Sequence, residues 1–168
     1  MAEFRIVHEF DADPQSFWRV FLDSEFQTEM YRSAGVKRVE KRREDLGDSL
    51  IVVANCGTDW DLPAALRSVL GGKALGYVET LTFSKRRGDG EARQQIELTV
   101  MRDRVHFEGS VTLERIGPAR VRRRYSGTVR IELPLIGKKL EQSTASAMQH
   151  RHDAAAQLMR VWLAKGAA

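Results

Sequence analysis

Cysteine is nearly missing from this sequence, since Cys56 is the only one among 168 residues. A single cysteine cannot form an internal disulfide, and it cannot build a zinc site alone. We therefore expect Cys56 to be a small buried apolar residue rather than a nucleophile.

Long apolar runs are also missing, because no stretch approaches the roughly 18 residues that a membrane-spanning helix needs. The first residues, Met1–Arg5, lack the charged-then-apolar pattern of a signal peptide. These two absences predict a cytoplasmic protein without a transmembrane segment, and they leave peripheral membrane contact open. A chain of 168 residues is long enough for one sizeable core and short for two, so we expect a single domain over residues 1–168.

Motifs of catalysis and cofactor binding are absent as well. There is no His-Glu-x-x-His and no Gly-x-Ser-x-Gly, and Gly71–Lys73 lacks the upstream glycine of a phosphate-binding loop. His150 and His152 are two residues apart, which points their rings roughly 160° apart on a helix, so they cannot share a metal ion. We therefore expect no metal and no cofactor, and catalytic residues stay unknown.

The net charge of +4 raises the question of nucleic-acid binding. Most clusters of Lys and Arg alternate with apolar residues or lie at apparent turns, as on solvated strand faces. No aromatic residues are interleaved with them in the manner of a base-stacking platform. We expect no nucleic-acid partner, and we keep binding of a protein or acidic membrane surface by the basic strand faces as an alternative.

The sequence begins with an alternating strand, Phe4–Phe10, in which His8 lies on the same face as the aromatic residues. Asp13 and Pro14 then form a helix-start signal, and a second helix is predicted from Ser24 to a stop at Gly35. Two short helices thus follow the first strand.

A series of strands joined by turns follows Gly35. Residues Gly57–Gly72 interrupt it with a loop and a short helix, Ala64–Leu70, which could act as a lid. Six strands are predicted: Val36–Glu44, Ser49–Cys56, Gly76–Ser84, Ala92–Met101, Val105–Arg115 and Arg120–Leu133.

Proline and glycine are almost missing from the last stretch, so we predict one helix of about 30 residues from Pro134 to Ala164. A spacing of about 100° per residue gathers one stripe along it: Ile136, Leu140, Thr144, Ala147, Arg151, Ala154, Leu158, Val161 and Trp162. Thr144 and Arg151 lie near its middle, where a tightly packed core would contain Leu or Ile, so the stripe indicates a lined pocket. A curved antiparallel sheet of about seven strands must bury one face, and this helix is the one element long enough to cover it. The order β-α-α-β6-α therefore predicts an α+β fold with the sheet wrapped around the terminal helix.

Three stretches carry a resemblance to a known superfamily: Phe4–Phe10 followed by Pro14, Phe17 and Trp18, the Leu62-Pro63 helix that ends in Gly71, and Glu132–Glu141 before the terminal helix. Together with the element order, they resemble the helix-grip superfamily (SRPBCC, START-like), which includes START lipid-transfer domains, pollen-allergen-like proteins and polyketide cyclase-like proteins. Within it, the chain looks most similar to a bacterial family of domains of unknown function, DUF family 2505. The resemblance implies a cavity between sheet and helix that holds a hydrophobic or amphipathic small molecule, and it does not imply catalysis.

Four polar residues fall on faces assigned to the interior: His8, Glu79, Arg123 and Arg151. A buried unpaired charge is costly, so we expect Glu79 to pair with Arg123 or Arg151. These groups either orient the polar end of a ligand, with an arginine binding a carboxylate or phosphate, or lie at the cavity mouth with their charged heads in water.

Five larger side chains are candidate cavity walls: Trp60, Tyr77, Tyr125, Met148 and Trp162. Aromatic residues at sheet or helix spacing also occur as plain core, so both interpretations stay open.

The favoured function is a carrier or sensor that binds a lipid-like or polycyclic molecule. The alternative from another class is a cofactor-free enzyme of the cyclase or dehydratase type that uses His8, Glu79 or Arg123. Because no catalytic motif is present, we favour a protein that is not an enzyme. A monomer and a homodimer both remain open.

Overall fold

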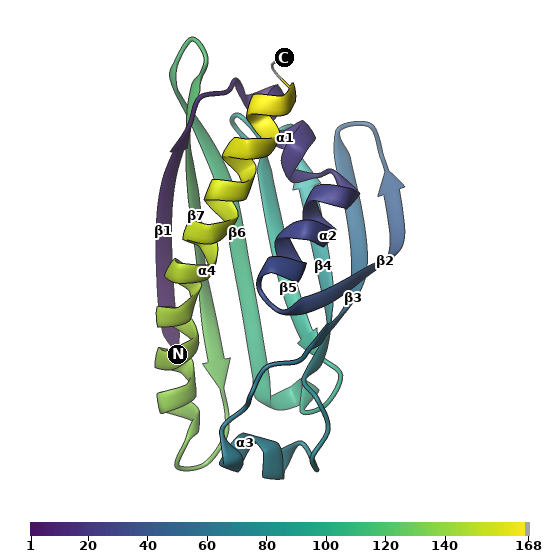
Figure 1. Cartoon of the computed structure of the whole chain (residues 1–168), viewed down its shortest axis with the longest axis vertical. Coiled ribbons are helices and arrows are strands. Elements are labelled where there is room, and N and C mark those ends of the chain that lie inside the picture. The colour runs from purple at the N-terminus through teal and green to yellow at the C-terminus, as the bar shows by residue number, and fades with distance from the viewer. Residues whose placement is uncertain (167–168) are drawn as a thin grey trace.

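The computed structural model describes residues 1–166, which form one seven-stranded antiparallel sheet wrapped around a long helix (Figure 1). The strand order is β1-β7-β6-β5-β4-β3-β2. Their bounds are β1 (Ala2–Phe10), β2 (Val36–Asp45), β3 (Ser49–Thr58), β4 (Gly76–Ser84), β5 (Glu91–Leu98), β6 (Val105–Gly117) and β7 (Arg120–Ile131). The predicted α+β helix-grip architecture is confirmed.

The helices are α1 (Pro14–Phe21), α2 (Ser24–Ser33), α3 (Ala64–Val69) and α4 (Gly137–Gly166), with one 3₁₀ turn, η1 (Arg102–Arg104). Helices α1, α2 and α4 lie on the same face of the sheet, and α3 lies beyond the end of the sheet at which α4 begins (Figure 1). Helix α4 packs on β1 and β7, at one edge of the sheet, whereas α2 packs on β2, at the other edge. None of the helices within residues 1–166 has the length and apolar character needed to cross a bilayer.

Aspartates cap the two short helices that follow β1. The Asp13 carboxylate accepts a hydrogen bond from the Ser16 backbone N–H at 2.8 Å, as the sequence predicts. The second cap is Asp23 rather than the predicted Ser24, because the Asp23 carboxylate accepts from the backbone N–H groups of Glu25 and Phe26, both at 2.9 Å.

Helix α4 begins at Gly137, three residues after the predicted start at Pro134. Leu135 has a left-handed backbone (φ 68°), which interrupts any helix before that point. A Cβ atom at Gly137 would collide with the backbone carbonyl oxygen of Ile131 in β7. Glycine therefore lets the helix start approach the sheet closely, as expected from the sequence.

The predicted buried stripe of α4 is partly wrong. Ala154 and Val161 are exposed, whereas Ala155, Ala156 and Met159 are buried. The C-terminal half of α4 contacts α1 and α2 as well as the sheet. The side chains buried there therefore lie on a different side of the helix from the predicted stripe. Three consecutive alanines also offer no contrast in hydrophobicity from which to choose a face.

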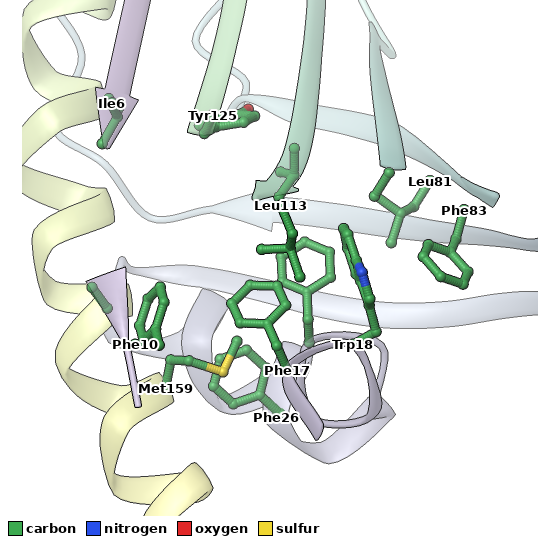
Figure 2. Close-up of a cluster of buried hydrophobic side chains, with 14 of the residues drawn as sticks. Ile6, Phe10, Phe17, Trp18, Phe26, Leu81, Phe83, Leu113, Tyr125 and Met159 are labelled. Carbon is green, nitrogen blue, oxygen red and sulfur yellow. The ribbon is translucent and has the colours of Figure 1, made fainter. Parts of the chain in front are cut away.

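Aromatic side chains fill the space between α1, α2, the C-terminal half of α4 and the sheet. Figure 2 shows Phe10, Phe17, Trp18, Phe26 and Met159 there, and we call this region the packed end. Phe17 is 0% exposed, and its ring lies 5.4 Å from that of Phe10 and 5.3 Å from that of Trp18. The packed end is therefore a solid core.

Candidate functional site

A cavity of about 440 Å³ lies between the sheet and the N-terminal half of α4. Helix α4 packs on β1 and β7, α2 packs on β2, and at the packed end Trp18 of α1 lies against Phe83 of β4. Beside the N-terminal half of α4, the inward faces of the middle strands form the cavity floor. We call this region the hollow end, and its apolar lining includes Met30, Leu81, Ile96, Phe107, Val129 and Met148.

Seven of the predicted site residues line this cavity: Trp60, Tyr77, Glu79, Arg123, Tyr125, Met148 and Arg151. Thr144, the other residue that interrupts the apolar stripe of α4, lines it too. The interruption in the stripe therefore coincides with the hollow end. Contact of these residues with a ligand stays a prediction.

His8 does not line the cavity. Its Nδ1 atom accepts a hydrogen bond from Nη2 of Arg123 at 2.7 Å, and its Nε2 atom donates to Oδ1 of Asp153 at 2.7 Å. Burial lowers the pKa of His8, which agrees with a neutral ring in this arrangement. The reason for its position is that β1 lies directly under α4, so inward side chains of β1 meet the helix instead of open space.

Trp162 also lies outside the cavity. Its ring packs edge-on against Phe26 at 5.6 Å, and its indole N–H donates to a Glu29 carboxylate oxygen at 3.1 Å. Trp162 belongs to the half of α4 that closes on α2, so it contacts that helix rather than the hollow end.

The expected pairing of Glu79 with Arg123 or Arg151 is wrong. Glu79 is 1% exposed, and its Oε1 atom accepts a hydrogen bond from Nε of Arg38, on β2, at 3.3 Å. Arg38 was hard to predict because the run of charged residues around it is typical of a solvated strand. It nevertheless follows Val36 by two residues, so both side chains lie on the inward face of β2.

Glu79 is the centre of a carboxyl network that also contains Tyr31, Arg38, Gln94 and Tyr125. Its Oε2 atom accepts from the hydroxyl of Tyr31 and from the amide nitrogen of Gln94. The hydroxyl of Tyr125 in turn donates to the amide oxygen of Gln94. Four members of the network line the cavity, whereas Arg38 lies behind them.

Burial raises the pKa of Glu79 to about 7, and the hydrogen bond from Gln94 opposes this rise. The Arg38 guanidinium favours the charged carboxylate, yet burial also lowers the pKa of Arg38. A buried carboxyl group with a raised pKa, placed beside the Tyr31 hydroxyl, is suited to accept or donate a proton inside the cavity.

A second polar group, the arginine wall, consists of Arg123, Arg151 and His152. The Arg151 guanidinium lies 4.0 Å from the centre of the Trp60 ring, a cation–π contact between α4 and the segment before α3. The ring of His152 lies 4.3 Å from that of Tyr125. Burial lowers the pKa of His152 to about 3, and nearby positive charges, Arg123 first among them, add to the effect, so this ring is neutral.

Four members of the carboxyl network and the arginine wall were not among the predicted site residues: Tyr31, Arg38, Gln94 and His152. Gln94 shares the parity of Ile96 and Leu98 on β5, so strand alternation could have placed it inside. His152 follows Met148 by four residues on α4, which puts both on one side of the helix.

Metal ligation finds no support in the part of the chain that the structure describes, where no group of three or more His, Cys, Asp or Glu side chains could hold an ion. Cys56 is buried, as expected, and it packs with Val36, Tyr77 and Leu98.

The family model described as "Protein of unknown function (DUF2505)" matches residues 5–163. The chain belongs to this family. Among curated proteins, none matches the sequence.

Solved structures of the START/SRPBCC superfamily share the fold of this family member. The Zhui aromatase/cyclase from Streptomyces sp. R1128 superposes with a TM-score of 0.69 at 11% identity, over 99% of this chain and 96% of that chain. A START superfamily protein from Mycobacterium smegmatis gives 0.61 at 11% identity, over 96% and 98%. Norcoclaurine synthase from Thalictrum flavum gives 0.61 at 13% identity, over 96% and 86%. At these identities the likeness establishes the fold alone.

Proposed function

We propose that the protein binds a hydrophobic or amphipathic small molecule, lipid-like or polycyclic, in the cavity at the hollow end and serves as a carrier or sensor. The observation that carries this proposal is a mainly apolar cavity of about 440 Å³ enclosed by α4 and the middle strands. Ligand sites typically have about 300–1,000 Å³, with apolar walls and a few polar groups. The polar groups here are the carboxyl network and the arginine wall.

The energetics favour an occupied cavity. An empty apolar cavity forfeits the dispersion contacts that a packed interior has. Each methylene group of a ligand that leaves water for this cavity contributes about 0.8 kcal/mol. An apolar body of moderate size therefore binds here without a specific polar contact.

The segment 59–75, which contains α3, is suited to control access. Leu62 and Leu66 line the cavity, but no residue of α3 is fully buried. Gly71 and Gly72 follow the helix with left-handed backbones (φ 62° and 75°), a conformation that glycine adopts without strain. The contact between Arg151 and Trp60 joins this segment to α4, so its release would open the cavity.

The fluorescent, uncharged dye N-phenyl-1-naphthylamine tests this function. We expect saturable binding to the wild-type protein, and loss of binding in Ala147→Trp, which places an indole in the cavity. Ala154→Trp is the matched control, because Ala154 lies on the same helix and is exposed. Absence of saturable binding to the wild type, or equal loss in both variants, would contradict the proposal.

The identity of the natural ligand needs a separate experiment. Native mass spectrometry of the protein purified from its own cells should show a co-purifying small molecule. The adduct should be absent from Ala147→Trp and present on Ala154→Trp. Its mass then separates lipid-like from polycyclic ligands.

A second candidate function is cofactor-free proton transfer on a bound ketone or enol. The observation that favours it is Glu79, whose pKa is about 7 and which accepts a hydrogen bond from Tyr31 within the cavity. His8, the other proposed acid or base, lies outside the cavity. Two of the similar structures are named as an aromatase/cyclase and a synthase.

Exchange of the α-hydrogens of 2-tetralone in deuterated water tests this activity by NMR. We expect the wild type to accelerate exchange, and Glu79→Gln to abolish the acceleration while it binds N-phenyl-1-naphthylamine within about 2-fold of wild type.

The remaining alternative, binding of a protein or acidic membrane surface by the basic strand faces, would be favoured by a filled interior. The interior contains a cavity of about 440 Å³ and is therefore not filled.

A further inference from the structure

Arg123 is a buried cation without a counter-ion. It is 2% exposed on β7, it lines the cavity, and no carboxylate of the described residues forms an ion pair with it. Burial lowers its pKa only to about 10, so the guanidinium keeps its charge at neutral pH. The Phe10 ring lies 5.3 Å from the guanidinium, and Asp153 reaches it only through His8, so neither supplies an anion in direct contact. A buried charge without a direct counter-ion is destabilising, so we expect an anion from outside the chain to balance it.

The hydrogen bonds of Arg123 leave most of its donors free. Nη2 donates to the neutral ring of His8, whose other nitrogen is held by Asp153. These two hydrogen bonds, from Arg123 to His8 and from His8 to Asp153, fix the position of one edge of the guanidinium. Nε has no partner among residues 1–166, although a guanidinium has five N–H donors.

The rest of the arginine wall is also without negative charge. Arg151 is half-buried and forms no ion pair with a described residue. His152 lines the same cavity as Arg123 and Arg151, and the positive charges of both arginines contribute to its lowered pKa. Nδ1 of His152 is buried without a hydrogen-bond partner. Glu79 is held by Arg38 and the carboxyl network, so it does not neutralise this wall.

We propose that the ligand carries a single negative charge, of the carboxylate class, and that its head group binds Arg123 and His152 while its apolar body occupies the hollow end. This inference rests on the proposed function and specifies the ligand that it takes. A monoanion balances the charge of Arg123, which has no ion-pair partner among residues 1–166, and neutral His152 can donate a second hydrogen bond to the same head group. Arg151 retains its contact with Trp60.

Two dyes with the same aromatic body test the charge preference: 1-anilinonaphthalene-8-sulfonate, a monoanion, and N-phenyl-1-naphthylamine, which is uncharged. Arg123→Met should weaken binding of the sulfonate dye about 10-fold or more, because it removes a charge-assisted hydrogen bond, and should change binding of the neutral dye by less than about 2-fold. Arg124→Met is the matched control, since Arg124 is the next residue on β7, pairs with Glu114 and does not line the cavity. It should change neither affinity by more than about 2-fold.

The outcomes separate the two proposals. If the neutral dye binds and Arg123→Met leaves the sulfonate dye unchanged, or weakens both dyes equally, the anionic preference is wrong and the binding function stands. If neither dye binds the wild type, the proposed function fails and this inference fails with it.

Competition on the wild-type protein covers the case in which Arg123→Met does not fold. Dodecanoate at pH 8 should displace N-phenyl-1-naphthylamine at a lower concentration than dodecanol does, although the alcohol partitions more readily into apolar surroundings. Equal or better displacement by dodecanol would overturn the proposal.

Discussion

The two ends of this molecule use the same sheet and the same helix, yet one is solid and the other is hollow. At the packed end, α1 and α2 insert Phe17, Trp18 and Phe26 between α4 and the strands (Figure 2). At the hollow end, α4 presents Thr144, Ala147 and Arg151, and α3 contributes no fully buried residue. The cavity therefore results from the absence of filling side chains, and the packed end is positioned to hold the sheet and α4 together around it.

The largest expected difference between the two ends concerns a phenylalanine in each. Phe17→Ala should lower the free energy of unfolding by about 3–5 kcal/mol, because it opens a new cavity in a solid core. Phe107→Ala should cost less, about 1–3 kcal/mol, since Phe107 already faces the cavity on one side. Urea denaturation measures both. Equal losses would mean that the hollow end is as tightly packed as the other.

The pH dependence of stability sharpens the comparison, because buried titratable groups line the hollow end. The pKa of Glu79 is about 7 in the folded protein and 4.5 as a model value, so the unfolded chain releases this proton first as the pH rises. The contribution of Glu79 to stability should therefore fall as the pH rises from 4.5 to 7, by up to about 3 kcal/mol. Glu79→Gln should remove that fall in urea titrations across this range, and an unchanged slope would contradict the raised pKa.

His152 should act with the opposite sign. Its pKa is about 3 in the folded protein against a model value of 6.5, so the unfolded chain binds the proton first as the pH decreases. The contribution of His152 to stability should therefore fall from pH 6.5 toward pH 3, and between pH 4.5 and 6.5 it opposes that of Glu79. His152→Gln should flatten this acidic limb, as measured by thermal unfolding, and should leave the limb above pH 6.5 unaltered.

Two alanines of α4 provide a smaller contrast. Ala156→Leu, in the packed end, should destabilise the protein by about 1–3 kcal/mol because it overpacks a site that is 0% exposed. Ala147→Leu, which lines the cavity, should change stability by less than about 1 kcal/mol. Thermal unfolding of the two variants checks this. Similar destabilisation by both would contradict an open space beside Ala147.

The smallest expected effect on stability concerns the contact between Trp60 and Arg151. Arg151→Leu should cost less than about 1 kcal/mol, the usual contribution of a partly exposed cation–π pair, and it leaves the hydrogen bond from the Trp60 indole to the Ala34 carbonyl oxygen in place. The same change should raise the rate of proteolytic cleavage within segment 59–75, because the segment loses its contact with α4. An unchanged cleavage rate would argue against a role of this contact in holding the segment.

Strand alternation and the proline and glycine positions were enough to predict the sheet, the long helix and seven of the nine proposed cavity residues, because each depends on local periodicity. The partners across the fold were not predictable in this way. Arg38 meets Glu79 because the strand register places both on the inward face, two strands apart, and His8 and Trp162 are excluded from the cavity because α4 lies close to β1 and α2. Those relations depend on tertiary packing that no single stretch encodes.

The contrast between the two ends is tested most directly by diffraction from a crystal of the protein under xenon pressure, since xenon enters empty apolar cavities and leaves packed cores unoccupied. We expect xenon density among Ile96, Val129 and Met148, and none among Phe10, Phe17 and Met159. Density at the packed end, or side chains that fill the space at the hollow end, would contradict it.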